Sequence, residues 1–347
     1  MKKVLFVVSQ IGTGGAERVI STLASYCADK GYDTTIIVFR DAEKNYPISD
    51  KVKIIKIKDS GNKATSILHR IRFIRRFIKE NLIDVYVTFE INYGFSCALG
   101  TKAKYITSMR NDPNSESVSL REKVLRKLNF LMANYVVFQT QEIMDYFSKS
   151  IKKHGIIIMN PLKRGLNEFH GDRNKEIVAV CRLEKQKNIP MMLKSFKYVY
   201  SKHPDYCLKI YGDGSLREDM EKLAVEYGIN DAVYFMGFQD KIDEKIRDAA
   251  MYICTSDYEG LSNSLLEAMA IGLPCVSTDS GGGGAKSVIK NGENGYLVPV
   301  GDAEKMQECI NYIIEHPDDA IKISNEAVKI KDKLSENIIC AQWEKLF

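Results

Sequence analysis

The sequence predicts an α/β protein of two domains, each a doubly wound parallel sheet that helices cover on both faces. Short apolar runs of strand length alternate with amphipathic helical stretches over residues 1–165, and this alternation begins again after Gly171. The length of 347 residues is enough for two domains that each bury a core. No repeat of about 20 to 50 residues is present, which argues against a solenoid.

The first half is expected to hold a run of short strands that are separated by helices. The clearest helical stretches are Ala16–Cys27 and Ser66–Lys79, where apolar residues recur at helical spacing. The expected strands are Val4–Val8, Thr35–Phe39, Val52–Ile57, Asp84–Phe89, Lys104–Thr107, Tyr135–Phe138 and Ile156–Met159.

The second half repeats the pattern after a junction near residues 161–173. Asp302–Phe347 is helical throughout by its pattern. The strands expected before it are Ile177–Cys181, Tyr206–Ile210, Val233–Phe235, Met251–Cys254 and Cys275–Ser277.

Composition favours a soluble globular protein of a reducing compartment. Apolar residues make up 45% and charged residues 27%, and no apolar run approaches the roughly 18 residues that span a bilayer. The apolar start of the chain is too short for a signal peptide and is expected to be a buried strand. The eight cysteines contain no C-x-x-C pair and the five histidines no ligand spacing, so neither disulfides nor a metal site is expected.

The net charge of +5 conceals an asymmetry between the two halves. Residues 1–170 hold 28 Lys and Arg against 16 Asp and Glu, whereas residues 171–347 hold 22 against 29. A basic half suggests a polyanionic partner. No nucleic-acid-binding module accompanies the charge, so nucleic acid is not expected to be that partner.

The most informative stretch runs from Cys254 to Gly272 and predicts a strand, a loop and a helix. Ser262 and Asn263 are good N-cap residues, and the helix stops at Gly272. Backbone N–H groups at such a helix start can seat a phosphate, here over residues 260–264. Glu267, one turn further in, could accept hydrogen bonds from ribose, and Glu259 could hold a group beyond the phosphates. Glutamates near a helix start are also favoured by the helix dipole alone.

Two further loops follow expected strands and carry phosphate-binding chemistry. Gly14 and Gly15 lie between a strand and a helix, but Glu17 stands where the dinucleotide fingerprint needs a glycine, which disfavours a hydride-transfer enzyme. Arg182 and Lys187 follow Ile177–Cys181, at the ligand-binding edge of a parallel sheet. A tight turn and a solvated basic loop are the alternatives at these two places.

Residues 62–79 combine an apolar face with many cations. Ile67, Ile71, Ile74 and Ile78 share one helical face, and cations occupy Arg70, Arg72, Arg75, Arg76 and Lys79. Further cations follow at Arg121, Lys123, Arg126 and Lys127. This composition is typical of a helix that docks on an anionic membrane, with an ordinary domain helix as the alternative.

Six motifs in a fixed order give the chain a resemblance that covers almost its whole length. Glu259–Pro274 resembles the E-x7-E signature of the retaining GT4 glycosyltransferases, which have the GT-B fold. The other motifs are Gly14–Arg18, Arg182–Lys187, Gly212–Gly214, Val233–Phe238 and Gly292–Pro299. The resemblance implies two Rossmann-like domains that face a cleft: an acceptor-side domain at 1–167 and a nucleotide-sugar domain at 168–329. A final helix at 330–347, which includes Trp343, would cross back to the first domain or else pack on its own.

The resemblance also implies a role for each candidate residue. Arg182 and Lys187 would stabilise the leaving diphosphate in place of a metal, Glu259 would orient the sugar, and Glu267 would hold the ribose. Gly14 and Gly15 would face the diphosphate and the acceptor. Gly237 and Phe238 would lie beside the base. The remaining donor contacts would come from Gly260, Leu261, Ser262, Asn263, Ser264 and Leu265.

Two positions depart from the family pattern. Arg110, in Ser108-Met-Arg-Asn, stands where many GT4 members have a histidine that reaches the transferred sugar. A cation there could still serve the leaving diphosphate, or Arg110 could be structural. Four glycines at Gly281–Gly284 replace a Gly-Gly-Pro sequence, and their contacts cannot be derived from the sequence.

The resemblance therefore implies a retaining hexosyl- or N-acetylhexosaminyltransferase that requires neither metal nor other cofactor. The expected donor is a nucleotide-sugar, with uridine favoured by family habit, and the expected acceptor is a lipid-linked oligosaccharide of surface polysaccharide synthesis. The protein would be cytoplasmic and peripheral on the inner face of the cell membrane. The alternatives are a catalytically silent nucleotide-binding partner of another transferase and a nucleotide-sugar epimerase of the same fold.

Overall fold

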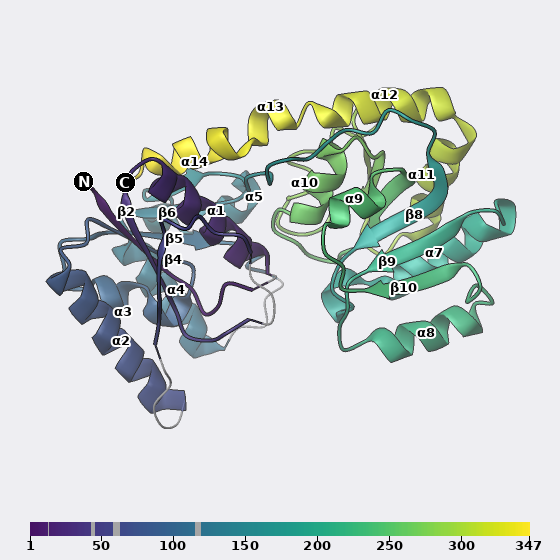
Figure 1. The fold of residues 1–347 in the computed structure, drawn as a ribbon. Helices are drawn as coiled ribbons and strands as arrows, with labels where there is room; N and C mark the ends of the chain where they lie inside the picture. Colours follow the sequence, from purple (N-terminus) through teal and green to yellow (C-terminus); the bar gives the residue numbers. More distant parts are fainter. Residues whose placement is uncertain (13, 43–45, 58–62, 115–118) are drawn as a thin grey trace. The chain divides into compact units, whose positions relative to one another are not determined.

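The protein divides into two compact units in the computed structural model (Figure 1). The structure describes residues 1–12, 14–42, 46–57, 63–114 and 119–347. The first unit comprises Met1–Pro161 together with Ser335–Phe347, and the second comprises Leu162–Leu334. The first unit thus ends at Pro161, before the expected domain boundary at 167. The chain returns to the first unit at Ser335, after the expected start of the final helix at 330.

The first unit is built on a parallel sheet with the strand order β3-β2-β1-β4-β5-β6-β7. Its middle strands are buried on both faces, because helices cover the sheet from both sides; Val4 to Val7 of β1, for example, have no exposed surface. The strands are β1 (Lys3–Val7), β2 (Asp33–Val38), β3 (Lys53–Lys56), β4 (Val85–Thr88), β5 (Lys104–Met109), β6 (Tyr135–Phe138) and β7 (Gly155–Ile157).

Helices and one 3-10 turn fill the connections of this sheet. Ser119 begins α4 with a capping box, in which its side chain and that of Glu122 satisfy each other's backbone N–H groups. The elements are α1 (Gly15–Asp29), α2 (Lys63–Glu80), η1 (Ile91–Tyr93), α3 (Phe95–Ala98), α4 (Leu120–Met132), α5 (Gln141–Asp145) and α6 (Lys149–Lys152).

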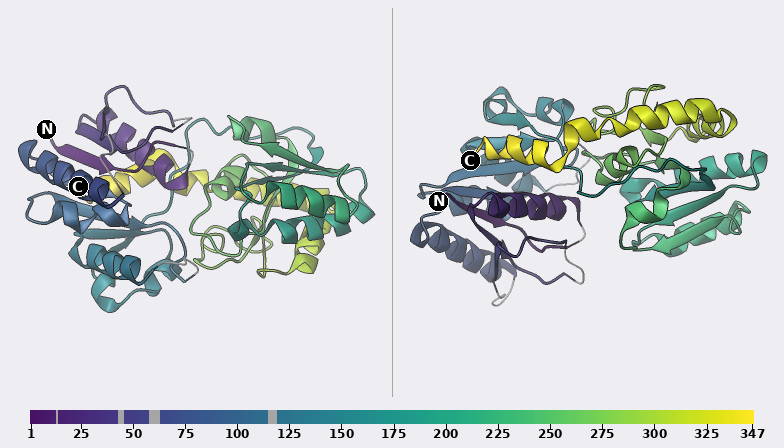
Figure 2. Two further views of the ribbon diagram at one scale, coloured as in Figure 1. Left: turned by 90° about the horizontal axis from the view of Figure 1, so that it is seen from below. Right: turned by 45° about the horizontal axis from the view of Figure 1, so that its top comes forward.

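The C-terminal helix α14 (Glu336–Glu344) packs against α1 of the first unit (Figure 2). The Glu344 carboxylate accepts hydrogen bonds from the hydroxyls of Tyr26 and Tyr32, at 3.0 and 2.7 Å. Trp343 is fully buried and its ring centroid lies 5.9 Å from that of Phe89. The end of the chain is thus part of the core of the first unit.

The second unit is built on another parallel sheet, with the order β10-β9-β8-β11-β12-β13. All strands expected from the sequence are present in the two sheets, and β13, which is only three residues long, was not expected. The strands are β8 (Asn174–Val180), β9 (Cys207–Tyr211), β10 (Val233–Gly237), β11 (Ala249–Cys254), β12 (Cys275–Thr278) and β13 (Tyr296–Val298).

Helices again cover this sheet, and the helical end expected after Asp302 is confirmed. Asp302 caps α11 by accepting a hydrogen bond from the Lys305 N–H. The elements are η2 (Lys185–Lys187), α7 (Ile189–Lys202), α8 (Arg217–Glu226), α9 (Ile242–Ile246), α10 (Asn263–Ala270), α11 (Ala303–Glu315), α12 (Pro317–Val328) and α13 (Lys331–Leu334).

Two arginines that were expected among surface cations are instead buried. Arg70 of α2 donates a hydrogen bond of 2.9 Å to the Tyr93 hydroxyl and lies over the ring of Phe39. Arg126 of α4 is buried with its guanidinium over the ring of Phe147. Partners from distant segments therefore hold these two cations inside the domain. No helix in the described part of the chain is long and apolar enough to cross a membrane.

Candidate functional site

The first group of candidate residues gathers where the strand order of the second sheet reverses. β9 and β10 follow β8 on one side, whereas β11 pairs with β8 on the other. Loops that leave two such neighbouring strands in opposite directions open a crevice at the carboxyl edge of the sheet. Arg182 and Lys187 follow β8, and Glu259 follows β11.

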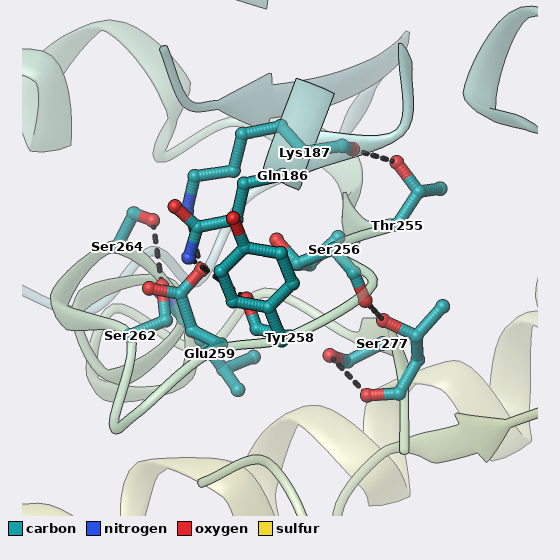
Figure 3. Close-up of polar contacts among 12 residues, drawn as sticks. Gln186, Lys187, Thr255, Ser256, Tyr258, Glu259, Ser262, Ser264 and Ser277 are labelled. Carbon is teal, nitrogen blue, oxygen red and sulfur yellow. Dashed lines mark hydrogen bonds and ion pairs between the residues drawn. The ribbon is translucent and has the colours of Figure 1, made fainter. Parts of the chain in front are cut away.

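Polar contacts hold the loops after β8 and β11 together (Figure 3). The Asp257 N–H donates to the Gln186 carbonyl at 2.9 Å, and the Gln186 side chain donates to the Tyr258 carbonyl at 2.8 Å. The Asn188 side-chain amide donates to the Asp257 carboxylate at 2.6 Å, and the Thr255 hydroxyl donates to the Lys187 carbonyl at 2.8 Å. These bonds fix both loops and place Lys187 opposite Glu259.

Lys187 and Glu259 form an ion pair at this edge of the sheet (Figure 3). Their side chains are 12% and 20% exposed, so the pair is shielded but can be reached from solvent. Burial acts to lower the pKa of Lys187, but the charge and hydrogen bond of Glu259, together with Cys254 and Cys181, outweigh it, so the pKa is raised above its usual value. Lys187 is therefore a fixed cation at neutral pH, and Glu259 is its anionic partner.

Helix α10 begins directly after this pair, as the sequence predicts. The Ser262 side chain caps the helix by accepting from the Leu265 N–H, and the Ser264 hydroxyl lies 2.9 Å from that of Tyr252. Glu267 is one turn in and 7% exposed, and its carboxylate lies 3.8 Å from the Lys163 ammonium. The helix start thus places N–H groups and carboxylates within one short stretch.

The glycines Gly281–Gly284 support the loop that carries Glu259. The Glu259 N–H donates to the Gly281 carbonyl at 3.0 Å. A Cβ on Gly284 would lie 1.7 Å from the Gly260 carbonyl oxygen, so only glycine fits at that position. Close packing of two backbones therefore explains the glycine at Gly284, one of the four that depart from the family pattern.

Arg182 is placed in the same loop as Lys187 but is exposed. Among the described residues, no carboxylate lies within ion-pair distance of its guanidinium. Gly212, which has φ +125°, packs on this loop, and a Cβ there would lie 1.9 Å from the Cys181 carbonyl oxygen. Gly237 ends β10 with φ +64° and accepts a 2.9 Å hydrogen bond from the Gly212 N–H; Phe238 after it is 49% exposed.

The first unit has a corresponding reversal of strand order between β1 and β4. There the Ser9 N–H donates to the Glu90 carboxylate at 3.0 Å, which joins the loops after the two strands. Gly14 caps α1, and a Cβ on it would collide with the Glu17 carboxylate. A pocket of about 210 Å³ opens beside these loops. Its polar lining comes from Glu17, Glu90, Thr107, Ser108, Arg110, Asn111, Arg126 and Asn129.

Arg110 lines this pocket and is held from several sides. Its guanidinium donates to the Asn160 side chain and lies 5.1 Å from the ring centroid of Phe89. Burial, and then the nearby Arg18, lower its pKa below that of a free guanidinium. In the described part of the chain no carboxylate pairs with Arg110, so an anionic or hydroxyl-rich ligand would relieve the cost of burying it.

The structure thus brings together Lys187, Glu259 and the start of α10, with Arg182 nearby, and places Gly14, Gly15 and Arg110 in the first unit. Sequence reasoning missed Gln186, Asp257 and Glu90, whose partners are distant in the chain. The sequence feature that could have pointed to these three residues is that each follows a buried strand, at the edge of the sheet where ligands bind. No cluster of His, Cys, Asp or Glu among the described residues could hold a metal ion.

Two family models match the chain. Residues 3–140 match "Glycosyl transferase 4-like", and residues 167–330 match "Glycosyl transferases group 1". The two matches follow the division of the chain into its two units.

Relatives and solved structures resemble the chain over nearly its full length. It is 24% identical to a Campylobacter jejuni α-1,4-N-acetyl-D-galactosaminyltransferase that acts on a diNAcBac-PP-undecaprenol-linked glycan, over 100% of this chain and 98% of the relative. It is 26% identical to the Erwinia amylovora amylovoran biosynthesis glycosyltransferase AmsD, over 90% of each chain. The structure of Anabaena HepE in complex with UDP and glucose matches with a TM-score of 0.85 at 16% identity, over 99% of each chain.

Proposed function

Since the chain belongs to the GT4-type glycosyl transferases of group 1 and is a glycosyltransferase of the GT-B fold, we propose that it transfers a sugar from a UDP-sugar to a lipid-linked glycan with retention of configuration. The observation that carries the proposal is the ion pair of Lys187 and Glu259 beside the start of α10. A cation, an anion and N–H groups are together there, and a nucleotide-sugar presents a diphosphate between two hydroxyl-bearing rings.

The donor is proposed to bind along Lys187, Glu259 and the start of α10. Arg182 and Lys187 would take the diphosphate oxygens, with the N–H groups at the start of α10. Glu267, inside the helix, would accept from the ribose hydroxyls, and Glu259 from the hydroxyls of the transferred sugar. The base would pass Gly237 and the exposed ring of Phe238. HepE, which was solved with UDP and glucose, supports uridine as the base and a hexose as the sugar.

The reaction is proposed to depend on cations of the protein instead of a metal. Negative charge develops on the diphosphate as its bond to the sugar breaks, and a preorganised cation stabilises that charge best. Lys187 is preorganised by its contact with Glu259, whereas the exposed Arg182 can turn to follow the leaving group. In front-face attack, the leaving phosphate would take the proton of the acceptor hydroxyl, and the configuration would be retained.

The acceptor is proposed to bind in the pocket of the first unit. Glu90 and Asn111 offer hydrogen-bonding groups, while Phe89 offers a ring face. A volume of about 210 Å³ suits one sugar ring, and Arg110 adds a cation for a phosphate or a hydroxyl. The Campylobacter relative, whose substrate is linked to undecaprenol diphosphate, and AmsD, named for amylovoran, support a lipid-linked acceptor of polysaccharide synthesis.

The first unit is also proposed to dock on the inner, anionic surface of the cell membrane. Exposed cations are present on α2 at Arg72, Arg76 and Lys79, and on α4 at Arg121, Lys123 and Lys127. Helix α4 adds exposed apolar side chains at Leu120, Val124, Leu128 and Met132, which repeat every four residues and so lie along one side of the helix. Apolar side chains beside cations suit the boundary between acyl chains and anionic headgroups.

The test is release of nucleoside diphosphate from a panel of nucleotide-sugars, with and without a bacterial lipid-linked acceptor extract. Release that requires one UDP-sugar, the extract and Glu259 would support the proposal, with Glu259→Gln as the control. Conversion of the donor without an acceptor would instead identify an epimerase. Tight binding of UDP with no turnover of any donor would identify a silent partner.

A further inference from the structure

Lys163 connects two carboxylates of the second unit, one of which is the proposed ribose ligand. Its ammonium forms a close ion pair with Asp243 and lies 3.8 Å from the Glu267 carboxylate. The three side chains are 32%, 15% and 9% exposed, respectively. They come from the start of the second unit, from α9 and from α10, so no sequence pattern joins them.

The backbone around Lys163 is fixed, so this contact is not that of a loose surface lysine. Leu162 is buried and its N–H donates to the Leu334 carbonyl at 2.8 Å. Asp243 lies in the first turn of α9, and α9 packs against α10. The lysine therefore has a defined place beside the outer end of the Glu267 side chain.

The two contacts of Lys163 differ in kind. The ammonium is in direct contact with Asp243, whereas 3.8 Å to Glu267 exceeds the length of a hydrogen bond. Asp243 thus holds the lysine, and the lysine stabilises the buried Glu267 carboxylate by its charge. A buried carboxylate needs such a charge nearby.

We propose that Lys163 is a positioning residue for the nucleoside end of the donor, acting through Glu267. Held by Asp243, it keeps the Glu267 carboxylate oriented so that it accepts hydrogen bonds from the two adjacent ribose hydroxyls. This inference rests on the proposed function, because it takes the ligand of Glu267 to be a ribose. It adds a residue that lies outside all six sequence motifs.

The test compares binding of UDP and of 2′,3′-dideoxy-UDP by isothermal titration calorimetry. Lys163→Gln should weaken binding of UDP about tenfold, the effect of losing one partly buried charge contact. Binding of the dideoxy probe should change less than about twofold, and Lys163→Arg should restore most of the preference for UDP. The matched control is Lys331→Gln, because Lys331 pairs with Glu168 at 2.9 Å in the same unit with similar exposure.

A double-mutant cycle tests whether Lys163 acts through Glu267. In a Glu267→Gln background, Lys163→Gln should cost little further affinity for UDP. Equal losses for both probes, or full additivity in the cycle, would show a merely structural ion pair and overturn the inference alone. Wild-type protein that binds neither UDP, GDP nor ADP would overturn the proposed donor site and this inference together.

Discussion

Lys187 and Glu259, 72 positions apart in the chain, form an ion pair at the point where the strand order of the second sheet reverses. The position of each side chain depends on both loops. Gln186, Asn188 and Asp257 hold the loop after β8 and the loop after β11 together. The pair is thus a property of two neighbouring strands. It fixes one cation and one anion at the edge where ligands of such sheets bind.

The first prediction concerns Lys187→Met. Loss of the cation should lower turnover about 100-fold or more, the cost of removing one preorganised group that stabilises developing charge. Affinity for UDP should fall by less than tenfold, since Arg182 and the start of α10 remain. The measurement is the rate of UDP release with the active donor, alongside calorimetric binding of UDP.

Lys209→Met is the matched control for that prediction. Lys209 pairs with Glu176 in the same sheet, and their side chains are 25% and 20% exposed. Glu176 lies in the first half of β8, away from the carboxyl edge of the sheet. Turnover should therefore stay near the wild-type value. A similar loss of turnover in both variants would mean that any broken ion pair of this sheet disables the enzyme, and the role of Lys187 would be refuted.

The sequence predicted what depends on local order and missed what depends on distant partners. The strands and the Ser262 cap follow from periodicity and from capping chemistry, which act within a few residues. Arg70 and Arg126 were wrongly expected at the surface. A helical pattern does not reveal that the hydroxyl of Tyr93 or the ring of Phe147 contacts the guanidinium inside the domain. Glu90, with its partner Ser9 at the end of another strand, was missed for the same reason.

The second prediction concerns Gly284→Ala. The added methyl group would lie 1.7 Å from the Gly260 carbonyl oxygen, so one of the two backbones must move. We expect a loss of about 2–3 kcal/mol in the free energy of unfolding, typical of overpacking, and weaker donor binding because the moving backbone adjoins Glu259. Urea denaturation and calorimetry measure these effects.

Gly292→Ala separates the steric effect from backbone strain. Gly292 has φ +77°, but no atom lies within 4 Å of its Cβ position. This variant should lose only about 1 kcal/mol, the cost of a left-handed alanine. Equal destabilisation of the two variants would contradict the close packing inferred for Gly284.

The third prediction concerns the pH dependence of the C-terminal helix. The hydrogen bond to Glu344 and burial raise the pKa of Tyr32 to about 12. Its neutral form is thus favoured in the folded state, so this stabilisation is fully present below about pH 10 and is lost as the pH rises to about 12. The Tm of the wild type should therefore fall between pH 10 and 12. Glu344→Gln removes the carboxylate, so its Tm should fall less over the same range.

Trp343, the single tryptophan, reports whether α14 stays in place during this titration. Its emission should shift to longer wavelength as wild-type protein is brought from pH 10 to 12, because the buried ring becomes hydrated. Wild-type and Glu344→Gln profiles that coincide over this range would show that Glu344 does not control Tyr32.

The fourth prediction concerns binding to the membrane. Leu120, Val124 and Leu128 of α4 are 79%, 51% and 40% exposed, and cations at Arg121, Lys123 and Lys127 accompany them. Changing the three apolar residues to Ser should weaken binding to phosphatidylglycerol-containing vesicles about tenfold or more, since each buried apolar side chain contributes about 1.5–3 kcal/mol when fully inserted. Vesicle sedimentation measures the bound fraction, and the melting temperature should stay within a few degrees.

Two controls show whether α4 acts specifically. Val225 and Ile321 are exposed apolar residues of the second unit, at 63% and 59%, so changing both to Ser removes similar surface without touching α4. This variant should bind vesicles like the wild type.

Arg70→Met should lower the melting temperature while leaving vesicle binding intact, because that guanidinium is buried against Tyr93. Undiminished binding by the α4 variant would refute docking through this helix, and equal loss in the Val225 and Ile321 variant would reduce the effect to general hydrophobicity.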